Sequence, residues 1–304
     1  MSILLMLSAH SVPAQGQPAT GGQYFVEILE NSDAVKCGRL DVQDSTRLVK
    51  VYYENDTGLV WPREHAVALI NQQAGSRPLF FIHGFMAAIL PILQRTTLGF
   101  NYLFFRDPGV RTKAVIHIIW PSNRLSYRRS KRIIRTHHAK LARILRDFIR
   151  QQPDRQIDLL CHSMGNRLFL ETIRRNPFDA HSFRKIILAA PDVGISEFEV
   201  SIPYLQQLAD SVLVLTHRKD RILLASQWRN HSPRLGRTPP PDLPSFIQVL
   251  DCTDAPIDHT RLARLNRHTY FLASDRARHL MEAFLYNDDL QAPSDHTCGT
   301  LSGR

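Results

Sequence analysis

Residues 155–174 read RQIDLLCHSMGNRLFLETIR. The apolar run that begins at Ile157 stops just before Ser163, and the apolar residues that follow recur at helical rather than alternating spacing. A buried strand that turns sharply into a helix, with a serine at the corner, is the geometry called a nucleophile elbow. The sequence therefore predicts that the turn presents Ser163 as a nucleophile and aims the backbone N–H of Met164 at the same point.

An elbow of this kind needs small residues two positions before and two positions after the serine, because strand and helix nearly touch there. Gly165 meets this requirement, whereas Cys161 stands where the usual pattern has glycine. Cysteine is itself small, so the departure leaves the predicted elbow in place.

The composition of the 304-residue chain is that of an ordered globular protein, with 43% hydrophobic and 22% charged residues. The length allows one large α/β core. A net charge of +10 favours contact with anionic surfaces but does not determine a fold. The four cysteines form no CxxC pair, so we expect neither a zinc site nor a disulfide framework. No P-loop and no G-x-G-x-x-G motif occur, which excludes kinases and dinucleotide enzymes; we expect no cofactor and no metal.

Apolar strands alternate with helical stretches along most of the chain, which predicts a mostly parallel sheet covered by helices on both faces. Two earlier strands, 24–29 and 47–53, are separated by turn residues at 31–33 and are expected to form the antiparallel start of a mixed sheet. The later predicted strands are 79–82, 114–120, 183–190, 211–216 and 246–250, with helices over 61–73 and 126–150.

We expect one α/β domain with extensions. The predicted segments are a flexible tail or truncated leader (1–22), the first strands of the sheet with a connector (23–76), the core (77–285) and a C-terminal tail (286–304). The apolar residues 3–7 are too few to span a bilayer. We expect a cytoplasmic protein, or an exported one if the first segment is a leader.

Seven motifs then occur in a fixed order. They are His83-Gly84-Phe85, Trp120-Pro121-Ser122, Tyr127, the elbow His162–Arg167, Ala190-Pro191-Asp192, Lys219–Leu223 and His268–Phe271. In this combination the chain resembles proteins of the α/β-hydrolase fold, and in particular the bacterial α/β hydrolases of unknown function of the DUF900 type, over roughly residues 77–285. The resemblance implies an α/β-hydrolase fold and serine-hydrolase chemistry.

A serine hydroxyl is a poor nucleophile unless a base removes its proton and an acid orients that base. In this fold the chain order is serine, acid, histidine. This order favours His268, which also matches the H-x-Y-F motif, and leaves His259 and His279 as alternatives. It excludes three histidines that precede the later strands: His83, His117 and His162.

Two aspartates are candidates for the acid. Asp220 follows the strand 211–216 at the position implied by the resemblance, and Asp192 follows the preceding strand. Either carboxylate could instead cap a helix or hold a loop, as aspartates at strand ends often do. We favour Asp220 as the acid and keep Asp192 as the alternative.

The second oxyanion donor is expected from the loop after His83, where Gly84 lets the chain turn closely. We predict that the backbone N–H groups of Phe85 and Met164 form the oxyanion hole. His83 itself is expected to anchor the loop.

The helix over 126–150 is strongly basic, with Asp147 as its one acidic residue. The favoured interpretation is a solvated outer face; the other is a platform for anionic lipid or another polyanion. Aromatic residues are not interleaved as a single-stranded nucleic-acid site requires, so we expect no nucleic-acid partner.

Together these patterns predict a serine hydrolase that cleaves a carboxylic ester or related acyl bond in a small-molecule or lipid substrate. The alternative function is a non-catalytic module of the same fold that binds a partner or an anionic membrane surface through its basic helix. The shape of the substrate pocket, which includes the excursion 223–244, does not follow from the sequence.

Overall fold

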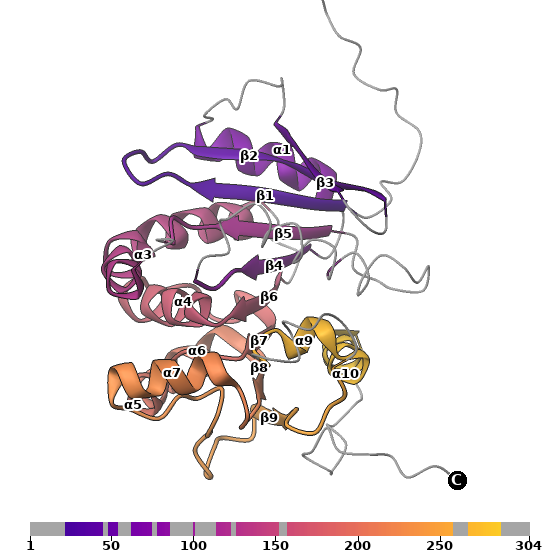
Figure 1. Ribbon diagram of the computed structural model, residues 1–304. Coiled ribbons are helices and arrows are strands. Elements are labelled where there is room, and N and C mark those ends of the chain that lie inside the picture. Colours follow the sequence, from indigo (N-terminus) through magenta and orange to yellow (C-terminus); the bar gives the residue numbers. More distant parts are fainter. Residues whose placement is uncertain are drawn as a thin grey trace, which may run out of the picture.

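The computed structural model describes residues 22–44, 48–53, 62–74, 78–85, 100, 114–122, 126–151, 157–257 and 267–286. Within these ranges the strands form one sheet in the order β3-β2-β1-β5-β4-β6-β7-β8-β9 (Figure 1). They are β1 (Gly22–Ile28), β2 (Val35–Asp44), β3 (Leu48–Tyr53), β4 (Pro78–Ile82), β5 (Ala114–Ile119), β6 (Ile157–His162), β7 (Phe183–Ala189), β8 (Ala209–Thr216) and β9 (Ile247–Asp251).

The sheet is mostly parallel, as predicted. β1 pairs in parallel with β5, and β4 to β9 continue the same direction. Only β2, antiparallel to both β1 and β3, runs the other way among the described strands. The two predicted early strands are present as β1 and β3, and the antiparallel start of a mixed sheet is confirmed, but the prediction missed β2, which lies between them. Its alternation changes phase between Cys37 and Leu40, which hides a ten-residue strand from a search for period two.

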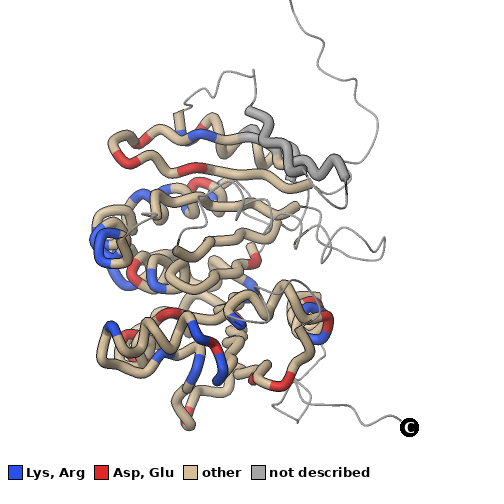
Figure 2. Tube along the Cα trace, in the orientation of Figure 1, with Lys and Arg blue, Asp and Glu red and all other residues tan. Residues whose placement is uncertain are grey.

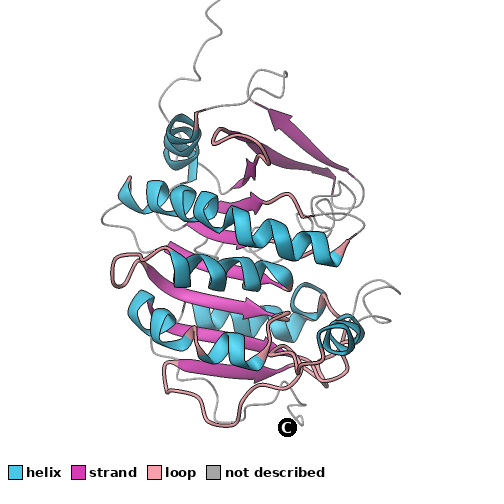
Figure 3. Ribbon diagram, turned by 90° about the vertical axis from the view of Figure 1, so that its left-hand side faces the viewer, coloured by secondary structure: helices cyan, strands magenta, loops and turns pink. Residues whose placement is uncertain are grey.

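Helices cover both faces of the sheet, which confirms the predicted architecture. They are α1 (Arg63–Ala74), α3 (Tyr127–Arg150), α4 (Met164–Arg175), α5 (Ile195–Glu199), α6 (Ile202–Leu208), α7 (Arg221–Asn230), α9 (Tyr270–Ala273) and α10 (Asp275–Tyr286). Residues of α1, α3, α4, α5 and α6 share one core with the sheet, whereas α9 and α10 pack in a second core. Figure 3 shows α3 and α4 side by side in front of the sheet.

The strands supply both cores by alternation. In β4, for example, Phe80 and Ile82 belong to the core beneath α3 and α4, and Leu79 and Phe81 to the core beneath α9 and α10. Every residue of β4 is buried, as expected of a central parallel strand. Polar groups of the site therefore gather where such strands end, since nothing along the strands themselves reaches water.

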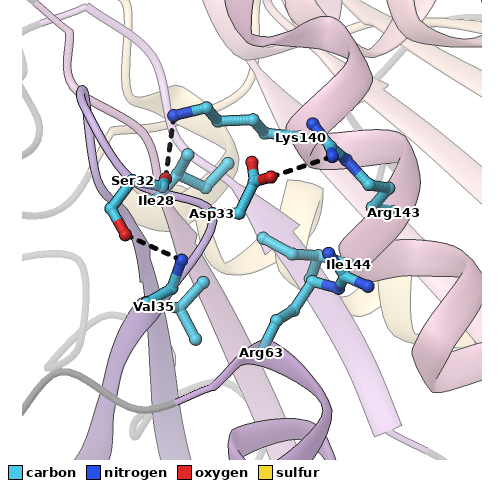
Figure 4. A pocket seen from close by; sticks show the side chains of 9 residues that line it. Ile28, Ser32, Asp33, Val35, Arg63, Lys140, Arg143 and Ile144 are labelled. Carbon is cyan, nitrogen blue, oxygen red and sulfur yellow. Dashed lines mark hydrogen bonds and ion pairs between the residues drawn. The ribbon is translucent and has the colours of Figure 1, made fainter.

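Helix α3 begins at the capping residue Ser126, whose Oγ accepts from the N–H of Arg129 at 3.2 Å. The C-terminal half of its basic face is bound to the turn between β1 and β2 (Figure 4). Lys140 donates to the carbonyls of Leu29, Glu30 and Ser32, and Arg143 lies 3.1 Å from Asp33. The cavity enclosed there measures only about 10 Å³, so these cations hold the fold together and line no usable site.

No helix in the described ranges has both the length and the hydrophobicity that crossing a bilayer requires.

Candidate active site

Ser163 stands at the corner between β6 and α4 with φ 53° and ψ −120°. A serine in this left-handed region is strained, and such strain persists only where the surroundings impose it. Here the N–H of Ser163 donates to the carbonyl of Ala189 at 3.0 Å. The carbonyl of Ser163 accepts from Asn166 Nδ2 at 3.0 Å and from the N–H of Asp192 at 3.2 Å. The elbow is thus fastened to the loop after β7.

Two glycines allow the chain to approach the elbow closely. A Cβ on Gly165 would lie 2.4 Å from the carbonyl oxygen of Ile82, and a Cβ on Gly84 would lie 2.8 Å from Cβ of Ser163. Cys161, by contrast, lies in β6 beside Ile82 and Leu188 of the flanking strands and is fully buried. The backbone therefore requires glycine two residues after the serine, at Gly165, whereas the position two residues before the serine accommodates the small side chain of Cys161.

Three side chains from distant parts of the sequence meet at the elbow: Ser163 directly after β6, Asp220 directly before α7 and His268 shortly before α9. Nδ1 of His268 lies 2.7 Å from Oδ2 of Asp220, and Nε2 lies 2.9 Å from Oγ of Ser163. An ionised carboxylate only accepts, so the imidazole proton resides on Nδ1 and leaves Nε2 to accept from the serine hydroxyl. All three side chains are shielded, with relative exposures of 5%, 0% and 8% respectively. Charge interactions among them are strengthened by this burial.

Asp220 makes a second contact through its other oxygen. Oδ1 accepts from the N–H of Leu223 at 2.9 Å and so caps helix α7. Helix capping and histidine contact were alternative interpretations of this residue in the sequence, and the structure shows both contacts at once.

The pKa of His268 is raised above its ordinary value of 6.5. Burial alone would lower it, but the charge of Asp220 and the hydrogen bond to its carboxylate outweigh burial, with a smaller contribution from Asp192. The site therefore stabilises the imidazolium that forms when a histidine takes a proton from serine.

Asp192, the alternative acid, is held by other partners. Its Oδ2 accepts from Tyr127 Oη at 2.9 Å and its Oδ1 accepts from Ser226 Oγ. The guanidinium of Arg234 lies 3.8 Å away. These contacts join α3, the loop after β7 and α7 behind the elbow.

The other histidines named from the sequence lie elsewhere. His279 is exposed on α10, and His259 lies outside the described residues. His83 accepts at Nε2 from the N–H of Trp120 at 3.1 Å, and burial lowers its pKa to about 4. Burial also lowers the pKa of His117 to about 3. His83 is further fixed by Trp120 Nε1, which donates to its carbonyl at 2.8 Å, so it anchors the loop that leads to Phe85.

The predicted oxyanion donors flank Ser163. Met164 is the first residue of α4, and Phe85 follows the glycine that abuts the serine. Neither N–H group has an acceptor among the residues that the structure describes. Both are thus available to a ligand oxygen, next to a helix N-terminus that favours negative charge.

Sequence reasoning missed the part played by two neighbours. Asn166 bridges the carbonyls of Ser163 and Ala189. His162, excluded as a base by chain order, packs its ring 4.8 Å from that of His268 and donates from Nε2 to the carbonyl of His268 at 3.3 Å. Its pKa is well below 6.5, chiefly through burial and then through repulsion from His268. In the sequence, the only indication of a role for His162 and Asn166 is their position inside the elbow motif His162–Arg167.

In the described part of the chain no three His, Cys, Asp or Glu side chains are arranged to hold a metal ion.

A family model described as "Alpha/beta hydrolase of unknown function (DUF900)" matches residues 63–281. Among solved structures, a lin2722 gene product of Listeria innocua is similar at 11% identity and a TM-score of 0.43, covering 73% of this chain and 97% of that chain. A predicted CIB-like hydrolase from Thermoplasma acidophilum is similar at 13% identity and a TM-score of 0.38, covering 87% and 99%. Phospholipase PlaB from Legionella pneumophila is similar at 11% identity and a TM-score of 0.33, covering 69% and 63%. These similarities are too distant to indicate a function, and a search of curated proteins found no match.

Proposed function

The chain belongs to this family of α/β hydrolases, and from that premise we propose that it is a serine hydrolase cleaving a carboxylic ester or a related acyl bond. One observation carries the proposal. A continuous run of contacts joins the carboxylate of Asp220, the imidazole of His268 and the hydroxyl of Ser163, at 2.7 and 2.9 Å. A hydroxyl hydrogen-bonded to a base that is itself oriented by an acid is the arrangement needed for nucleophilic catalysis.

In the proposed reaction Oγ of Ser163 attacks the acyl carbon while Nε2 of His268 takes the hydroxyl proton. Asp220 keeps the imidazole in the required tautomer and stabilises its positive charge. The tetrahedral intermediate then collapses, the bond to the alcohol breaks, and Nε2 returns the proton to the departing oxygen. Water repeats the sequence on the acyl-enzyme and releases the acid.

The oxyanion of each tetrahedral intermediate is proposed to accept hydrogen bonds from the N–H groups of Phe85 and Met164. One such donor contributes about 2.7–4 kcal/mol to transition-state stabilisation. The dipole of α4, which begins at Met164, adds to this effect.

A fluorophosphonate probe tests the proposal, because it forms a covalent bond only with an activated serine. Wild-type protein should be labelled, and mass spectrometry should place the label on Ser163. Ser163→Ala should lose labelling while keeping the wild-type circular dichroism spectrum. Ser196→Ala, at an exposed position on α5, is the matched control and should label normally. Equal labelling of folded Ser163→Ala would remove this residue from the proposed role.

A second candidate function is a non-catalytic module that binds an anionic membrane surface through α3. It is favoured by the N-terminal half of the helix, where Arg128, Arg132 and Arg135 are exposed and have no partner among the described residues. Lys and Arg concentrate along this helix (blue in Figure 2). Failure of wild-type protein to react with the probe, together with binding to anionic vesicles, would favour this function over the hydrolase.

A further inference from the structure

A groove of about 320 Å³ lies between α3 and α4, with the start of α5 at one end. It opens on the face formed by the two helices that lie side by side in Figure 3. None of the proposed catalytic residues lines it. Its lining residues are Lys131, Ile134, Arg135, Arg167, Glu171, Arg174, Arg175 and Glu197.

The groove carries an excess of positive charge, because five of its lining residues are cations and two are carboxylates. Both carboxylates are already bound within the groove. Glu171 is paired with Arg174 and Arg175, and Glu197 is paired with Arg167. Lys131 and Arg135 both line the groove, and neither forms an ion pair with a carboxylate of the described residues.

The pKa of the Lys131 ammonium group reflects this excess of positive charge. Its pKa is lowered, first by burial and then by repulsion from Arg167, against the opposing effect of Glu197. Its ammonium group donates to the neutral amide oxygen of Asn230 at 3.0 Å. An anion in the groove would relieve the repulsion that the cations exert on one another.

Arg167 forms the inner wall of the groove and is only 8% exposed. One of its terminal nitrogens, Nη2, donates to Glu197. Its Nε and Nη1 are enclosed and have no acceptor among the described residues, and the same holds for Nε of Arg174. Buried guanidinium N–H groups without acceptors are costly, so the inner wall of the groove keeps hydrogen-bonding capacity that the described residues do not use.

We propose that this groove binds an organic phosphate, whose oxygens accept from Lys131, Arg135 and Arg174 beside the positive charge of Arg167. Guanidinium groups match the geometry of phosphate oxygens and bind them in pairs. A single water needs roughly 10–15 Å³ of space measured in this way. The groove, at about 320 Å³, is therefore large enough for a phosphate together with an attached organic group. Ile134, buried in α3, gives that group an apolar wall. The phosphate belongs either to a small soluble ester or to the headgroup of a phospholipid.

Calorimetry with glycerol 3-phosphate tests the soluble source, and co-sedimentation with phosphatidylglycerol vesicles tests the lipid source. Arg167→Gln removes the charge of the inner wall, and the double variant Arg135→Glu with Arg175→Glu reverses two exposed cations of the rim. Each should weaken binding of the effective probe at least about tenfold. Arg150→Glu, exposed at the far end of the same helix, is the matched control and should bind like the wild type.

Binding of glycerol 3-phosphate with this pattern identifies a soluble ligand. Vesicle binding that Arg167→Gln weakens, without binding of glycerol 3-phosphate, identifies a lipid headgroup. If Arg167→Gln does not fold, the rim variant decides, provided that Arg128→Glu with Arg132→Glu, on the same helix but outside the groove, binds more tightly than the rim variant. Wild-type protein that binds neither probe, or folded variants that bind as tightly as Arg150→Glu, would overturn the site. These outcomes are independent of labelling at Ser163.

Discussion

Asp220 contacts His268 with one carboxylate oxygen while its other oxygen caps helix α7 through the N–H of Leu223. The cap fixes the rotation of the carboxylate, and the carboxylate in turn fixes the imidazole. The orientation of His268 toward Ser163 therefore depends on the first turn of α7, although no residue of that helix has a place in the proposed reaction.

This double contact makes the outcome of Asp220→Asn predictable. The amide oxygen should stay at the helix cap, because only it can accept from Leu223. The amide NH₂ then faces Nδ1 of His268 and forces the proton onto Nε2, the wrong tautomer. In a serine protease triad the same change lowers turnover about 10,000-fold. We expect a loss of at least about 100-fold in kcat for a p-nitrophenyl ester, with little change in Tm because asparagine caps helices well.

Asp192→Asn is the matched control, since its oxygens accept from Tyr127 and Ser226. It should reduce kcat much less than Asp220→Asn. Asp220→Ala should lose both the activity and the helix cap. Its free energy of unfolding should therefore be about 1 kcal/mol lower than that of Asp220→Asn. If Asp192→Asn proves the more damaging of the two asparagine variants, the assignment of the acid to Asp220 is wrong.

The sequence predicted the parts of this site that lie next to strand ends. The chain order of the fold led to His268, and the resemblance to α/β hydrolases led to Asp220 in preference to Asp192, since both aspartates follow strands whose C-terminal ends lie at one edge of the sheet. The contacts of Asp192 could not be predicted, since Tyr127 and Ser226 reach it from helices distant in sequence. Local patterns carry no information about such packing.

Gly165 gives a prediction about stability. A Cβ there would lie 2.4 Å from the carbonyl of Ile82 and 2.6 Å from that of His83, and backbone atoms cannot move aside cheaply. Gly165→Ala should destabilise the protein by about 1–3 kcal/mol or more, measured as a lower Tm. Gly194→Ala is the control, because its Cβ would meet only side-chain atoms, Ser232 Oγ at 3.2 Å and Glu197 Oε2 at 3.6 Å as the nearest. A Tm for Gly165→Ala equal to that of Gly194→Ala would show that the elbow tolerates a side chain.

The two halves of α3 give a prediction about membranes. Arg128→Glu with Arg132→Glu should weaken sedimentation with anionic vesicles at low salt, and added salt should weaken wild-type binding in the same way. Lys140 and Arg143 are bound to the turn between β1 and β2, so their replacement should lower Tm instead. Hydrolysis of a small neutral ester should stay within a few-fold of wild type in the arginine variant. If the wild-type protein does not bind anionic vesicles at low salt, the basic face of α3 is a solvated outer face and not a membrane surface.

His268 must be neutral to accept the proton of Ser163, so kcat/KM should fall as pH decreases through the pKa of His268. Because that pKa is raised, the midpoint of the fall should lie above 6.5.

Asp220→Asn removes the charge and the hydrogen bond that raise the pKa of His268 and leaves burial, which lowers it. The residual activity of this variant should therefore have its acid midpoint at a lower pH than the wild type. Stability should respond with the matching sign. A raised pKa in the folded state contributes stability that is complete below pH 6.5 and is lost as pH rises through the folded value. The stabilising effect of His268 relative to His268→Gln should accordingly be larger at pH 6 than in alkaline solution. If the acid midpoint of kcat/KM lies below pH 6.5 in the wild type, or is the same in Asp220→Asn as in the wild type, the ionisation of His268 does not control the proposed reaction.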